Sequence, residues 1–125
     1  MTATPLRMAG LRCEDARQVA RDVLSAHGVG ERLVADVLLV VSELVSNAVR
    51  HAGGVTDFHV RHLRDCVAVD VSDATPACPR APGTPVEAPG GFGWMLVNRI
   101  AARTEIRSGR AGKTITALIP LSAAT

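Results

Sequence analysis

The chain has 125 residues, of which 47% are hydrophobic, and its mean hydropathy is +0.20; both values favour a folded domain over general disorder. No apolar run approaches the roughly 18 to 20 residues of a membrane span, and residues 1–7 lack the order of a secretory signal. The net charge is only +2, which argues against direct nucleic-acid binding. We therefore expect one cytoplasmic domain over residues 1–125, with neither nucleic acid nor membrane as a partner.

The first half of the chain changes from a helical to an alternating pattern. Apolar residues spaced i, i+3, i+4 and i+7 predict amphipathic helices over 13–27 and 31–51, each followed by glycines that end it. After Gly54, apolar residues alternate with polar ones, which predicts strands over 55–63 and 66–73.

Prolines dominate the next stretch, so residues 74–90 are expected to form a long loop. A helix over 94–102 and strands over 104–108 and 113–121 complete the chain, and residues 5–9 are compatible with an edge strand. This order predicts an α+β fold, a two-layer α/β sandwich with a mixed, mostly antiparallel sheet and helices on one face.

One face of the second predicted helix carries Glu43, Asn47 and His51 at spacings of four residues. Asn47 falls between Val40 and Leu44 around the helix, so it interrupts the apolar stripe. A polar side chain that points toward a core needs partners. The spacing leaves two interpretations open: a ligand or metal ion, or a hydrogen bond to the neighbouring backbone.

Two further features are each ambiguous alone. Asp73 lies two residues after Val71 in the predicted strand, so it is expected on the same, helix-covered face. It could accept a hydrogen bond from a ligand amine or be an ordinary turn residue. Residues 90–93 (Gly-Gly-Phe-Gly) lead into a helix. The glycines either let main-chain N–H groups approach a phosphate or only make the helix entry flexible.

Together and in this order, the three features resemble the ATP-binding boxes of the GHKL (Bergerat-fold) ATPase superfamily, especially the small anti-sigma factor serine kinases. Residues 43–51 resemble the N box, 69–73 the strand before the G1 box, and 91–97 the G2 box. Residues 112–115 resemble the Gly-x-Thr segment of the last strand. The resemblance covers about residues 19–120 and implies the histidine-kinase-like ATPase fold.

The resemblance implies ATP and Mg²⁺ as cofactors. Asn47 would hold the Mg²⁺ that bridges the ATP phosphates, and Glu43 would be the general base. Arg50 would contact a phosphate.

For the rest of the nucleotide, the resemblance implies that Asp73 accepts a hydrogen bond from the adenine amino group. The main-chain amides of Gly91 and Gly93 would cradle phosphate, and Thr114 would lie near the adenine. The family often has Asp-x-Gly after the G1 strand, whereas residues 73–75 are Asp-Ala-Thr.

The function implied is that of an ATP-binding regulator with serine/threonine kinase activity toward a protein antagonist. Its partners would be a sigma factor, that antagonist or both, and the family often forms homodimers. Two alternatives stay open: a non-catalytic protein-interaction module on the same fold with weak or no ATP use, and a histidine-kinase catalytic fragment acting in trans.

Overall fold

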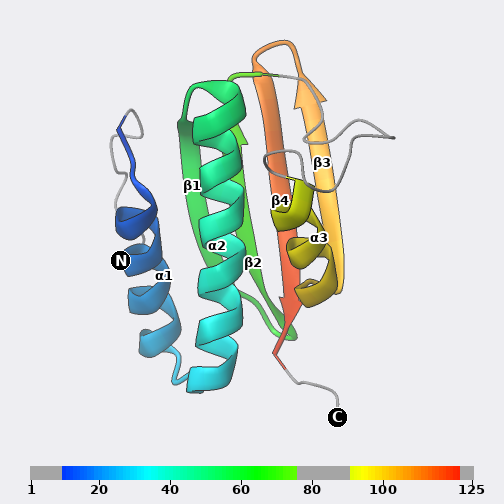
Figure 1. Cartoon of the computed structure of the whole chain (residues 1–125). Helices are drawn as coiled ribbons and strands as arrows, with labels where there is room; N and C mark the ends of the chain where they lie inside the picture. Colours follow the sequence, from blue (N-terminus) through cyan, green and yellow to red (C-terminus); the bar gives the residue numbers. More distant parts are fainter. Residues whose placement is uncertain (1–9, 76–90, 122–125) are drawn as a thin grey trace.

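The described part of the chain is a layer of helices packed on one face of an antiparallel sheet (Figure 1). The computed structural model describes residues 10–75 and 91–121. Its helices and strands, in chain order, are α1 (Cys13–Ala26), α2 (Glu31–Ala52), β1 (Val55–His62), β2 (Cys66–Asp73), α3 (Gly91–Ile100), β3 (Arg103–Gly109) and β4 (Gly112–Pro120).

The strand order is β1-β2-β4-β3, and each neighbouring pair is antiparallel. The α+β sandwich with helices on one face is therefore confirmed. The helix α3 begins at Gly91 rather than at the expected residue 94, so the predicted glycine-rich entry forms its first turn. The edge strand proposed over 5–9 and nearly all of the loop over 74–90 lie outside the described residues.

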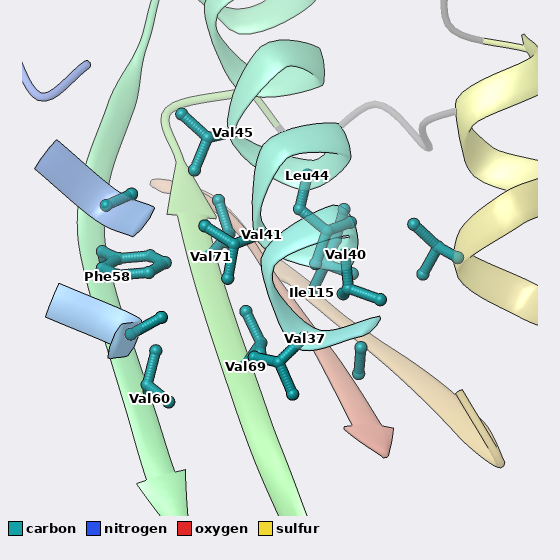
Figure 2. Close-up of a cluster of buried hydrophobic side chains, with 14 of the residues drawn as sticks. Val37, Val40, Val41, Leu44, Val45, Phe58, Val60, Val69, Val71 and Ile115 are labelled. Atoms are coloured by element: carbon teal, nitrogen blue, oxygen red, sulfur yellow. The ribbon is translucent and has the colours of Figure 1, made fainter. Parts of the chain in front are cut away.

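The core lies between α2 and the sheet (Figure 2). Valine and leucine side chains of α2 face aliphatic and aromatic side chains of the strands, and each fully buried one contributes about 1.5–3 kcal/mol. The labelled members of this cluster are Val37, Val40, Val41, Leu44, Val45, Phe58, Val60, Val69, Val71 and Ile115. Helix α2 ends at Gly53, whose φ of 77° is left-handed, and Gly54 N–H donates to the Ala48 carbonyl over 2.9 Å.

The register between β2 and β4 decides which side chains share the helix-covered face. Asp73 lies opposite Lys113, and Val71 lies opposite Ile115. Since Val71 and Ile115 both belong to the core under the helices, Asp73 and Lys113 point to that face as well. The end of β2, the start of β4 and the end of α2 lie at the same end of the molecule (Figure 1).

The structure also bears on the expected absence of a membrane segment. Within residues 10–75 and 91–121, no helix has the length and apolar character that crossing a membrane requires.

Candidate functional site

Asn47 lies on α2 with the residue 8% exposed, within a helix face that is otherwise aliphatic. Its side-chain oxygen Oδ1 is buried and has no hydrogen-bond partner among the described residues. A buried polar atom left in that state costs about 1–3 kcal/mol, so it indicates a group that binds there. An amide oxygen is a ligand that Mg²⁺ accepts, and Asn47 therefore fits a magnesium ion that is shared with phosphates.

Glu43 lies one helical turn before Asn47 and contacts the first turn of α3. A Cβ atom built on Gly93 would lie 2.9 Å from Glu43 Cδ and nearer still to Oε1. A side chain at position 93 would therefore require the end of the Glu43 side chain to move. The contact brings together two segments that are about fifty residues apart in the sequence, the predicted N box and G2 box.

Asp73 ends β2 with the residue 5% exposed, and its carboxylate accepts hydrogen bonds from a side chain and from the main chain. Lys113 Nζ lies 2.9 Å from Asp73 Oδ2 and 3.1 Å from Oδ1. The main-chain N–H of Thr75 also donates to Asp73 Oδ1, over 2.9 Å. The carboxylate expected to recognise a base is therefore already paired with a cation.

Thr114 lies on the other face of the sheet from Asp73 and Lys113, and its place near the adenine stays a prediction. Its hydroxyl bonds to the Ser72 hydroxyl at 2.7 Å, on the sheet face opposite to the helices. The reason is the two-residue period of a strand, which gives the helix-covered position to Lys113. The sequence carried the signal, because Lys113 has the parity of Ile115 and Ala117, the apolar positions of the same strand.

The close approach of β4 to Asp73 depends on Gly112. Its φ is +141°, and a Cβ there would lie 2.9 Å from Ala74 Cα. A glycine at this position lets β4 begin directly beside the end of β2, which places Lys113 opposite Asp73.

The remaining predicted residues are more peripheral. Arg50 is exposed and lines an open cavity of about 570 Å³ with Arg12, Cys13 and Val49, where the end of α2 meets the start of α1. Gly91 is the first residue of α3. Their contacts with a phosphate stay predictions.

The match to known sequences defines the class of protein. The family model of the histidine kinase-like ATPase domain matches residues 8–119. The chain therefore belongs to this family of ATP-binding domains. No curated protein matches the chain.

Solved structures agree with this fold. The blue-light activated histidine kinase of Erythrobacter litoralis EL346 superimposes with a TM-score of 0.59 at 20% identity, covering 86% of this chain and 41% of that one. The histidine kinase domain of the same protein gives 0.56 at 18% identity, with 95% and 66% covered. The chain thus spans less than two thirds of either structure. The histidine kinase domain of the E. coli osmosensor EnvZ gives 0.48 at 17% identity, with 99% and 94% covered.

Proposed function

We propose that this chain is an ATP-binding regulatory protein of the anti-sigma factor kinase type. It binds a sigma factor and, with Mg-ATP, phosphorylates a serine or threonine of a protein antagonist. The family supplies the ATP-binding domain, and the resemblance of residues 43–51, 69–73 and 91–97 to the boxes of anti-sigma factor serine kinases supplies the finer assignment.

The observation that carries the proposal is the buried Oδ1 of Asn47, which has no hydrogen-bond partner among the described residues and lies one turn from a glutamate that contacts the glycine entry of α3. An apolar residue at position 47 would pack better in a domain that bound nothing. A bound magnesium ion neutralises phosphate charge, which is the main requirement of phosphoryl transfer.

In this proposal, each site residue has a separate role. Asn47 holds the metal through Oδ1, and the N-terminal amides of α3, from Gly91 and Gly93, bind phosphate oxygens. The Glu43 carboxylate accepts the proton of the attacking hydroxyl. The hydroxyl oxygen forms a bond to the γ-phosphorus, the bond from that phosphorus to the β–γ bridging oxygen breaks, and ADP leaves with the electron pair.

Transfer of label from [γ-³²P]ATP to candidate antagonist proteins tests this function. We expect acid-stable phosphate, as phosphoserine or phosphothreonine, and loss of transfer in Glu43→Gln with Mg-ATP binding retained. Acid-labile phosphate would favour the histidine-kinase fragment instead. A Glu43→Gln protein that still transfers label at the wild-type rate would contradict the assigned base.

One observation favours the non-catalytic module as a second candidate. Asp73 is paired with Lys113, and no glycine follows it in residues 74–75. Co-purification of the chain with a partner, without label transfer at millimolar Mg-ATP, would support this alternative.

A further inference from the structure

The Asp73–Lys113 pair lies at the point where the proposed function needs a free carboxylate. Both side chains are buried, with 5% of Lys113 and 3% of Asp73 exposed. They lie directly opposite each other in β2 and β4, so the short distance is built into the register of the sheet.

The ammonium group of Lys113 has three N–H bonds, and three acceptors lie within reach. They are Oδ1 of Asp73 at 3.1 Å, Oδ2 at 2.9 Å and the Thr75 carbonyl oxygen at 3.3 Å. The ammonium of Lys113 thus contacts both oxygens of the carboxylate that the proposed function assigns to the base.

A base amino group is a neutral donor, whereas the ammonium carries a full charge. Separating a buried pair leaves one of its charges uncompensated, which is strongly unfavourable. An adenine amino group that takes the place of the ammonium at Asp73 therefore binds at a loss of free energy.

We propose that Lys113 competes with the nucleobase for Asp73 and thereby sets a low affinity for adenine nucleotides. This inference rests on the proposed function, because it takes Asp73 as the base-recognising carboxylate. The base subsite has two states: one closed by the Lys113 ammonium, and one in which the ammonium has moved and the adenine amino group donates to Asp73.

The sequence offers a direct probe, because Lys113 is the only lysine in the chain. Protein labelled with ¹⁵N-lysine therefore gives a single side-chain ammonium signal. We expect saturating adenosine and Mg-ATP to shift this signal. Magnesium tripolyphosphate, which lacks the base, should leave it in place.

Variants test the same competition through affinity. Lys113→Gln removes the charge and keeps a neutral donor, and it should tighten Mg-ATP binding by about tenfold or more. Lys113→Met is a second variant, and its folding is checked by circular dichroism. The matched control is Arg61→Gln, which removes the cation from the Arg61–Asp70 pair on the opposite face of the same sheet and should leave the Kd unchanged.

The outcomes separate this inference from the proposed function. Binding of Mg-ATP by wild type that becomes tighter in Lys113→Gln supports the inference. Wild-type binding with an unmoved Lys113 signal, or with no tightening in folded Lys113 variants, overturns it and leaves the proposed function intact. No binding of Mg-ATP in any folded variant overturns both.

Discussion

At the scale of single residues, Asn47 and Gly93 are positions where ligand binding and side-chain packing make different demands. Asn47 places a side-chain oxygen that has no partner among the described residues between aliphatic side chains. At position 93, the absence of a side chain leaves the space that the Glu43 carboxylate occupies. Each position therefore has a consequence for the stability of the free domain as well as for the ligand.

Asn47→Leu should change stability and binding in opposite directions. Removing the buried unsatisfied oxygen should raise the free energy of unfolding by about 1 kcal/mol. The same change removes the proposed metal ligand, so Mg-ATP binding should be lost. Urea denaturation and calorimetry measure the two effects, and a variant that is less stable yet binds normally would contradict this role of Asn47.

Gly93→Ala should weaken Mg-ATP binding by only about two- to threefold, because the flexible end of the Glu43 side chain can move away from the added methyl group. Gly109→Ala is the matched control, since a Cβ at Gly109 meets nothing within 4 Å. Quenching of Trp94 fluorescence, from the only tryptophan and a residue of α3, follows the titration. Equal effects of the two substitutions would argue against a specific Glu43–Gly93 contact.

At the scale of elements, α2 combines two tasks. The aliphatic stripe of α2 packs on the sheet (Figure 2), and the same helix carries Glu43 and Asn47. The helix is followed by Gly53, whose left-handed φ of 77° ends it.

Gly53→Ala should lower the free energy of unfolding by about 1–2 kcal/mol, because alanine is strained at a φ of 77°. Gly109→Ala is the control, because Gly109 has no positive φ and a Cβ there meets no atom within 4 Å. Thermal unfolding of both variants measures the difference, and similar losses would show that the conformation of Gly53 is not what ends the helix.

The elements also show how much of the structure could be predicted from the sequence. Hydrophobic periodicity predicted α1, α2, β1 and β2, whose buried faces are apolar. Strand β3 is mostly exposed and carries one apolar side chain, so its pattern is weaker. Angular position alone singled out Asn47, and strand parity placed Asp73. Lys113 was missed because the resemblance of residues 112–115 drew attention to Thr114, and because pairing between β2 and β4 is a long-range contact.

At the scale of the whole molecule, the two faces of the sheet carry different chemistry. The helix-covered face holds the core and the Asp73–Lys113 pair. On the other face, Asp70 accepts hydrogen bonds from Arg61 at 2.8 and 3.2 Å and from the hydroxyl of Thr116 at 2.6 Å. The bond to Asp70 raises the pKa of Arg61 above its usual value, so the guanidinium stays charged.

Substitution of two aspartates of β2, which are three residues apart, therefore distinguishes an effect on nucleotide binding from an effect on stability. Asp70→Asn weakens the network of the open face and should lower stability, with no change in nucleotide binding, because Asp70 lies on the face away from α2 and α3. In Asp73→Asn, Lys113 and the Thr75 N–H would bond to the one oxygen of the side chain, so its N–H₂ group would face the amino group of adenine. Two donors would then face each other with no acceptor between them, which disfavours binding.

Calorimetric titration of Mg-ATP into wild type, Asp73→Asn and Asp70→Asn tests the central claim, an adenine-nucleotide site at the helix-covered end of β2, most directly. We predict saturable binding in wild type, a Kd at least about tenfold weaker in Asp73→Asn, and a Kd within about twofold of wild type in Asp70→Asn. Absence of binding in wild type at millimolar nucleotide, or equal losses in the two variants, would contradict the assignment of this site.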